Sequence, residues 1–251
     1  TDMSEAEEVE ITGDAEQSGD EEIEISEEDS DTEENVADVF SDGAEDSTTL
    51  VEAGSIGAGN AAYRLYADGT LVIDGQGAFI SSKFRDDSRI KSIRVSEGVT
   101  DLGGDYSYAF WGCENLTIVS LPESLENIGE MTFYECKNLS TINIPSGVTS
   151  IGKSAFSNCE KLTGITIPSG MTKIEDSTFD GCKSLESITI PSGVTSIGNS
   201  AFSNCERLGS IEIPAGVTSI GTNIMRGCSN LRSATLPEGA TVSYTHLTLP
   251  T

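Results

Sequence analysis

The chain has 251 residues, of which 36% are hydrophobic and 22% are charged, and its formal net charge is −28 at pH 7. This negative balance disfavours binding to nucleic acid, because phosphates attract basic surfaces. No apolar run reaches the length of a membrane span, and the sequence does not open with the charged and apolar segments of a signal peptide.

Acidic residues are concentrated at the start of the chain. Residues 1–53 hold 22 of the 42 Asp and Glu residues and no Lys, Arg or His. Scattered Val and Ile residues cannot bury enough apolar surface to offset the entropy of ordering such a segment. The Asp-rich pattern of a calcium-binding loop is absent. We therefore expect residues 1–53 to be a disordered acidic tail that acts as a solvated spacer.

The next segment predicts a β-hairpin. Apolar or alternating runs at residues 63–66 and 70–73 lie on either side of Ala67, Asp68 and Gly69. A short Asp-Gly turn between two such runs is a strong hairpin signal.

From residue 90 to residue 241 the sequence repeats a unit of 23 residues, of which residues 139–161 are typical. A fixed period of this length indicates a solenoid, in which each unit forms one rung of a stack. Six of the seven prolines and all six cysteines recur with this period: Pro122, Pro145, Pro168, Pro191, Pro214 and Pro237, and Cys113, Cys136, Cys159, Cys182, Cys205 and Cys228.

Each unit divides into three parts. The run Leu-x-x-Ile-x-Ile at residues 139–144 predicts a short strand with one face on the core, and Pro145-Ser-Gly147 predicts a turn that ends it. Ile151, Ala155 and Cys159 follow at a spacing of four, which favours a short helical return. Such a unit cannot bury its apolar face alone, so we expect the strands of successive rungs to pair about 4.8 Å apart in a parallel sheet.

The motif Leu-x-x-Ile-x-Ile-Pro-x-Gly-Val-Thr-x-Ile-Gly-x-x-Ala-Phe-x-x-Cys resembles the leucine-rich repeats of the BspA-like family of bacterial surface proteins, over residues 54–241. The resemblance implies a leucine-rich-repeat solenoid of six rungs at residues 90–241, mostly β with short α segments, preceded by a β-hairpin N-terminal cap at residues 54–89. The cap would cover the open apolar face of the first rung. The departures from the motif are Leu125 and Met171 for Val, Glu175 for Gly, Thr132 and Thr178 for Ala, and Ile224 and Met225 for Ala-Phe.

The first rung carries an insertion that includes Tyr106 and Tyr108, close to the only tryptophan, Trp111. Insertions in a solenoid emerge as surface loops, and exposed aromatic residues are a common recognition surface. Alternatively, Trp111 next to Phe110 closes the core near the cap.

The cysteine and threonine columns each allow more than one interpretation. A thiol column suggests disulfides or metal binding. Metal binding is disfavoured because Cys-x-x-Cys pairs are absent, and disulfides are disfavoured because parallel Cβ vectors do not fit the required dihedral angle. Buried reduced thiols are therefore favoured. Regularly spaced threonines suggest ice binding. Ice-binding faces usually present paired rows of threonines, whereas this chain has a single column, so bonding of the hydroxyls to backbone at the turn is favoured. That single column is Thr100, Thr149, Thr172, Thr195, Thr218 and Thr241.

Residues 242–251 abandon the repeat, since an Ile is expected at Ser243. Back-translated, they resemble an adaptor used in preparing sequencing libraries, so we expect them to be non-native. They contain the only histidine, His246. Without it there is no Ser-His-Asp or Cys-His arrangement, and phosphate-binding Gly-rich loops are also absent. The sequence therefore predicts a protein that is not an enzyme and holds no cofactor.

One row of strand residues predicts the binding surface. These residues alternate with buried Ile residues and form a nearly uncharged strip that suits an extended protein or glycan. The resemblance implies a secreted or cell-surface location and adhesion to host extracellular-matrix or cell-surface proteins. Two alternatives remain, namely a strip that is only solvated and a structural spacer arm that displays other domains. The strip consists of Ser120, Asn143, Thr166, Thr189, Glu212 and Thr235.

Overall fold

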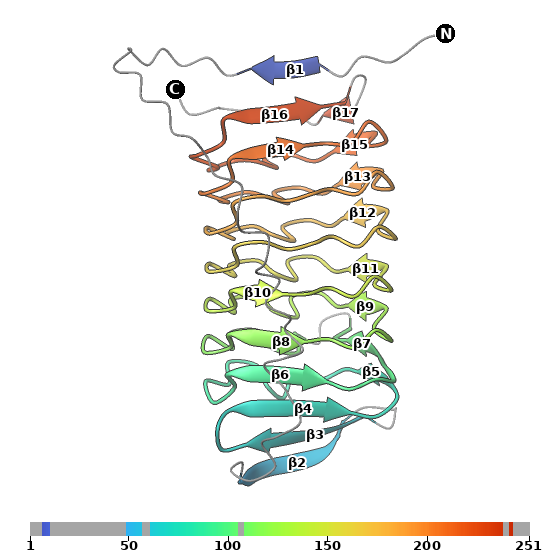
Figure 1. The fold of residues 1–251 in the computed structure, drawn as a ribbon, viewed down its shortest axis with the longest axis vertical. Helices are drawn as coiled ribbons and strands as arrows, with labels where there is room; N and C mark the ends of the chain where they lie inside the picture. The colour runs from blue at the N-terminus through green and yellow to red at the C-terminus, as the bar shows by residue number, and fades with distance from the viewer. Residues whose placement is uncertain (1–6, 11–48, 57–60, 105–107, 238–240, 243–251) are drawn as a thin grey trace, which may run out of the picture.

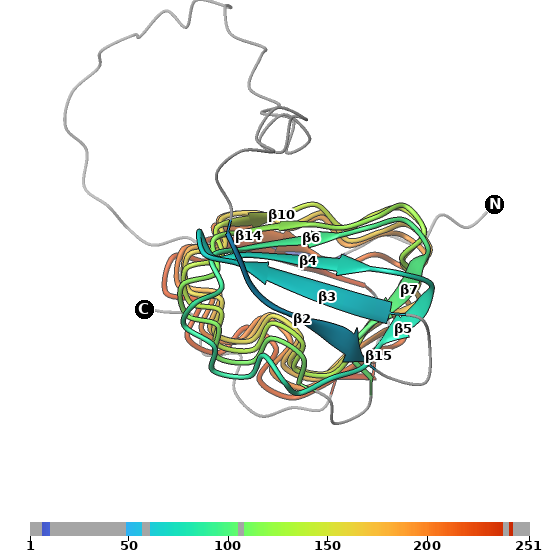
Figure 2. The same cartoon turned by 90° about the horizontal axis from the view of Figure 1, so that it is seen from below.

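The computed structural model describes residues 7–10, 49–56, 61–104, 108–237 and 241–242. These residues form a stack of rungs that runs from β2 at one end to β16 at the other (Figure 1). Seen along the stack, each rung has a front segment, a side segment set at an angle to it, and an irregular return (Figure 2). We call the three surfaces the front wall, the side wall and the return wall.

The front wall begins with a six-stranded sheet of order β10-β8-β6-β4-β3-β2. Strands β2, β3 and β4 pair antiparallel, and from β4 onward the pairing is parallel. The β3–β4 hairpin confirms the hairpin that was predicted around Ala67-Asp68-Gly69. The strands are β2 (Leu50–Ile56), β3 (Ala61–Tyr66), β4 (Thr70–Asp74), β6 (Ser92–Val95), β8 (Ile118–Ser120) and β10 (Thr141–Ile142).

Strand β4 of the cap pairs with the first rung in the way that the front strand of a further repeat would. Leu71 and Ile73 of β4 lie beside Ile93 and Val95 of β6, and all four side chains are buried. Since β4 occupies the edge next to β6, it covers the apolar face that the first rung would otherwise leave open.

The side wall consists of two four-stranded sheets, β11-β9-β7-β5 and β12-β13-β15-β17, both parallel. At the far end of the front wall, β14 (Ser210–Glu212) pairs with β16 (Ser233–Leu236), and β1 (Glu7–Glu10) pairs with β16 antiparallel. The side-wall strands are β5 (Gly77–Phe79), β7 (Val99–Leu102), β9 (Asn127–Ile128), β11 (Ser150–Ile151), β12 (Lys173–Ile174), β13 (Ser196–Ile197), β15 (Ser219–Ile220) and β17 (Thr241–Val242).

Two predictions about the ends fall largely outside the described residues. Of the predicted tail, residues 1–53, the structure describes only residues 7–10 in β1 and 49–53, which lead into and form part of β2. Of the predicted non-native end, residues 242–251, it describes only Val242 in β17.

The returns are turns, so the prediction of short helical returns is wrong. Ser154 and Asn158 have φ angles of 53° and 60°, in the left-handed region that interrupts a right-handed helix. The N–H groups of Ser154, Phe156 and Asn158 donate to carbonyls of the next rung, at 3.0, 3.0 and 2.7 Å, rather than to residues four positions earlier. The spacing of four that suggested a helix comes from left-handed residues that recur every four positions.

A column of stacked phenylalanine rings fills the core. Phe110, Phe133, Phe156, Phe179 and Phe202 are each at most 1% exposed, and successive ring centroids lie 5.5 to 5.9 Å apart. Two rings of the cap, Phe79 and Phe84, stack on Phe110 at 6.0 and 6.4 Å. The column therefore joins the cap and the repeats in one core.

The six cysteines are free and buried, as predicted. Each thiol donates to the carbonyl oxygen of the phenylalanine 26 residues earlier, or 29 earlier for Cys113, at 3.0 to 3.3 Å. Burial raises the pKa of every thiol, that of Cys113 to about 12 and that of Cys228 to about 11. The column acts as a set of small buried side chains that link neighbouring rungs.

Two hydroxyls of the threonine column bond to backbone of the preceding rung, whereas the Thr100 hydroxyl donates to the Asp101 carboxylate at 2.6 Å. The Thr195 hydroxyl donates to the Thr172 carbonyl oxygen at 3.1 Å, and the Thr218 hydroxyl donates to that of Thr195 at 3.4 Å.

Candidate binding groove on the front wall

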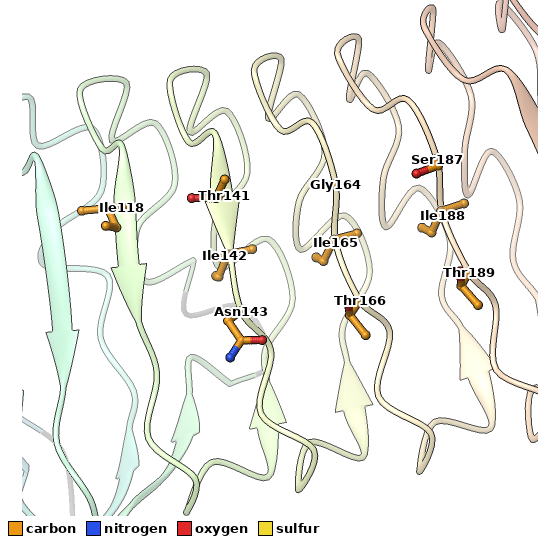
Figure 3. A pocket seen from close by; sticks show the side chains of 10 residues that line it. All are labelled: Ile118, Thr141, Ile142, Asn143, Gly164, Ile165, Thr166, Ser187, Ile188 and Thr189. Carbon is orange, nitrogen blue, oxygen red and sulfur yellow. The ribbon is translucent and has the colours of Figure 1, made fainter. Parts of the chain in front are cut away.

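A shallow, open groove of about 510 Å³ lies on the front wall, spans rungs 3, 4 and 5, and is also lined by Ile118 of rung 2. Rung 3 is residues 139–161, rung 4 is residues 162–184 and rung 5 is residues 185–207. Figure 3 shows that the groove follows the axis of the stack and crosses the strand direction. Its lining residues are Ile118, Thr141, Ile142, Asn143, Gly164, Ile165, Thr166, Ser187, Ile188 and Thr189.

The alternation of the strands arranges these residues in three rows. A central row of Ile142, Ile165 and Ile188 turns into the core, and these side chains are 6, 8 and 9% exposed. Outward-facing residues border it on both sides (Figure 3). One border row is Ile118, Thr141, Gly164 and Ser187, and the other is Asn143, Thr166 and Thr189.

Glycine in the middle of the first border row deepens the groove. A Cβ atom at Gly164 would meet no atom within 4 Å, so this position is open space between Thr141 and Ser187. The second border row is formed by exposed side chains that carry a hydroxyl or an amide.

The front wall has few paired backbone segments beneath the groove. Strand β10 pairs with β8, and β14 pairs with β16, but between β10 and β14 the described residues form only one bridge, from Thr166 to Thr189. Two further backbone bonds, from Thr163 N–H to Ser140 and from Glu186 N–H to Thr163, are 3.2 and 3.1 Å long. The groove therefore lies where the front wall has the fewest backbone hydrogen bonds.

The groove offers hydrogen bonds and small apolar surface, and none of its lining residues carries a charge. Its hydroxyls come from Thr141, Thr166, Ser187 and Thr189, and its amide comes from Asn143. No histidine, carboxylate or amine lines it, so these hydroxyls have no neighbouring general base within the lining. This chemistry suits binding of an extended, uncharged segment.

Only part of the predicted strip lines the groove. Asn143, Thr166 and Thr189 line the groove, whereas Glu212 and Thr235 lie further along the same row, side by side in β14 and β16. Sequence reasoning missed the other border row. The signal was available, because residues two positions apart in a strand face the same side.

The aromatic residues of the first rung form a separate cluster. Tyr106 lies outside the described residues. Tyr108 packs edge-on against Trp111 with ring centroids 5.3 Å apart, and Tyr134 does so at 4.9 Å. The Arg85 guanidinium lies 3.9 Å from the centroid of Trp111. We call Arg85, Tyr108, Trp111 and Tyr134 the aromatic cluster.

Trp111 is half-buried at the surface, and its neighbour Phe110 enters the core. Phe110 therefore forms the core here, and Trp111 lies at its edge. Tyr134 was missed from the sequence, although it follows Trp111 by 23 residues and so occupies the same column of the next rung. Burial is the main cause that raises its pKa.

Parallel strands that recur once per rung, with a Leu and Ile core and a stacked Phe column, define a leucine-rich-repeat solenoid. Residues 78–205 and 149–246 match the BspA type leucine rich repeat region in six copies, so the chain belongs to this family. None of the curated proteins compared with the chain matches it significantly.

Several solved structures are similar to the chain, and two of them carry the comparison. A leucine rich cell surface protein from Faecalibacterium prausnitzii A2-165 is 30% identical with a TM-score of 0.58, and the match covers 76% of this chain and 55% of that one. The chain thus spans about half the length of that relative. A leucine-rich repeat protein of T. pallidum (TpLRR) is 22% identical with the same TM-score, over 71% of this chain and 91% of that one, and shares the fold.

Two kinds of feature are absent from the described residues. They contain no helix long and apolar enough to cross a membrane. Among the same residues, no group of three or more His, Cys, Asp or Glu side chains is placed to hold a metal ion.

Proposed function

We propose that this chain is a secreted or cell-surface adhesion module that binds an extended segment of a host extracellular-matrix or cell-surface protein along the front groove. The observation that carries the proposal is the groove itself, in which three successive rungs present an uncharged lining of hydroxyl, amide and methyl groups.

The location is supported by family membership and by one relative. The chain belongs to the BspA type leucine-rich repeats, and the 30% identical protein is described as a leucine rich cell surface protein.

The shape of the groove favours a ligand that contacts several rungs weakly. Each rung contributes two or three small side chains, and no deep pocket anchors a single group. Affinity in such a surface comes from the sum of modest contacts over a rigid repeat. An extended protein segment or a linear glycan has this form, and we favour the protein because aromatic stacking platforms are absent from the lining.

The alternative function is a structural spacer that positions other domains. The observation that favours it is the regular stack itself, whose core columns continue from the cap to the last rungs while the groove remains shallow.

The decisive experiment places three lysines on the front wall. The triple variant Asn143→Lys, Thr166→Lys and Thr189→Lys fills the groove with charge, and we expect it to abolish attachment to immobilised fibrillar collagen and laminin. The melting temperature should hardly change, because the three side chains are exposed.

The matched control adds the same charge to the same rungs at another surface. Ser146, Ser169 and Ser192 are exposed turn residues, and their replacement by Lys should leave attachment intact. Equal attachment of wild type and both variants would contradict the front groove as the site. Absence of attachment by the wild type would favour the spacer, and loss after removal of glycans from the matrix proteins would identify a glycan ligand.

A further inference from the structure

The boundary between rungs 3 and 4 differs from the neighbouring boundaries on the side wall. At the boundary of rungs 4 and 5, Thr195 N–H donates to Thr172 at 2.9 Å and Gly198 N–H donates to Ile174 at 2.8 Å. The same two bonds recur between rungs 2 and 3 and between rungs 5 and 6, from Thr149, Gly152, Thr218 and Gly221.

Between rungs 3 and 4, both equivalent bonds are missing. Within the described stretch 108–237, Thr172 N–H does not bond to Thr149 and Glu175 N–H does not bond to Ile151. The side wall accordingly divides here into two sheets, one that ends with β11 and one that begins with β12.

A single residue accounts for this break. The glycine that begins each return approaches the backbone of the preceding rung so closely that a Cβ atom would overlap it. Such an atom would lie 2.6 Å from the Glu130 nitrogen at Gly152, 2.5 Å from the Asp176 nitrogen at Gly198 and 2.5 Å from the Asn199 nitrogen at Gly221. In rung 4 this position is Glu175. Its Cβ atom needs the space that glycine leaves free in the other rungs, so the start of this return cannot approach the backbone of rung 3.

The interior of the boundary is packed less tightly as well. A small apolar gap with no room for water remains, lined by Ile151, Ile167, Met171, Ile174, Thr178 and Phe179. The Phe156 and Phe179 rings lie 5.9 Å apart, against 5.5 and 5.7 Å for the pairs on either side. Loss of van der Waals contact at such a gap lowers the cost of deformation.

The return wall remains closed at the same boundary. Ser154, Phe156 and Asn158 donate their N–H groups across it to Asp176, Thr178 and Asp180. The two rungs are therefore joined along the return wall, unpaired on the side wall and sparsely bonded on the front wall. An element joined firmly along one edge and only weakly along the others moves as a hinge.

We propose that Glu175 makes the boundary of rungs 3 and 4 a hinge, and that the ligand segment in the front groove crosses this hinge and fixes its angle. Thr141, Ile142 and Asn143 lie on one side of the boundary, and the lining residues of rungs 4 and 5 lie on the other. Opening of the hinge changes the distance between these two parts of the groove. The ligand half of this inference rests on the proposed function, whereas the hinge itself does not.

The hinge is tested by amide hydrogen exchange on three variants of one residue. In Glu175→Gly the start of the return can approach rung 3, so the two missing backbone hydrogen bonds can form. We expect amide exchange at Thr172 and residue 175 to slow about tenfold, since one backbone hydrogen bond contributes on that scale. Glu175→Ala retains the Cβ atom and should exchange like the wild type. Glu175→Gln retains the side chain without charge and should also match the wild type.

Two exchange results would overturn the hinge. Slowing in Glu175→Ala equal to that in Glu175→Gly would show that the Cβ atom does not hold the boundary open. Wild-type protection at Thr172 equal to that at Thr195 would show that no open boundary exists.

The ligand half is tested by attachment of Glu175→Gly to the same immobilised collagen and laminin. We expect attachment about tenfold weaker, because a closed boundary fixes the groove in another shape. Unchanged attachment together with slowed exchange would overturn the coupling and leave the hinge. Absence of wild-type attachment would overturn the proposed function and hence the coupling, while the exchange data decide the hinge separately.

Discussion

Replacement of Phe156 by alanine tests the core column most severely. The ring is 0% exposed and is stacked between Phe133 at 5.5 Å and Phe179 at 5.9 Å. Truncation of a buried Phe to Ala costs about 3 to 5 kcal/mol, and each aromatic pair contributes about 0.5 to 1.5 kcal/mol beyond its buried area. Because two pairs are lost, we expect a cost in the upper half of that range.

Rung 6 supplies the matched control. Met225 occupies the same column there and is buried, so a methionine fits this column. We expect Phe156→Met to cost clearly less than Phe156→Ala, since it loses the two aromatic pairs but retains most of the buried volume. Urea unfolding followed by far-ultraviolet circular dichroism measures both variants. A cost below about 1.5 kcal/mol for Phe156→Ala, or equal costs for the two variants, would refute the column as a main source of stability.

Two further predictions concern thiols and pH. The six cysteines should resist a thiol reagent such as Ellman's reagent in the folded chain at pH 8 and react after unfolding, because burial raises the pKa of every thiol. Fast reaction of Cys159 in the folded chain would contradict its burial. Strand β2 should loosen in acid, because hydrogen bonding to Lys83 lowers the pKa of Glu52 below its ordinary value of 4.5. The stability that this lowered pKa contributes is fully present above pH 4.5 and is lost as the pH falls through the pKa of the folded state. Protection factors of β2 amides at pH 7 and pH 3 measure this, and Glu52→Gln should remove the difference; the same difference in that variant would assign the effect to another group.

The repeat predicted the fold because each column residue meets its own copy in the next rung. Ile142, Ile165 and Ile188 are buried for the reason that their alternation suggested. The returns could not be predicted in the same way. A spacing of four between Ile151 and Ala155 fits a helix as well as a turn, and only the left-handed Ser154 and Asn158 distinguish them.

The groove was predicted by one border row alone. Asn143, Thr166 and Thr189 follow from strand alternation, but the thinning of the backbone pairing beneath them does not. Glu175 was recognised as a departure from the motif. Its consequence depends on the approach of one rung to the backbone of the rung before, which no pattern within a repeat reveals.

The most direct test of the binding site is hydrogen exchange of the chain with and without soluble laminin. We predict added protection confined to residues 139–145, 162–168 and 185–191, the front segments of rungs 3, 4 and 5. Protection that appears instead at the aromatic cluster around Trp111, or that is absent from all three front segments in a complex that forms, would contradict the front groove as the binding site.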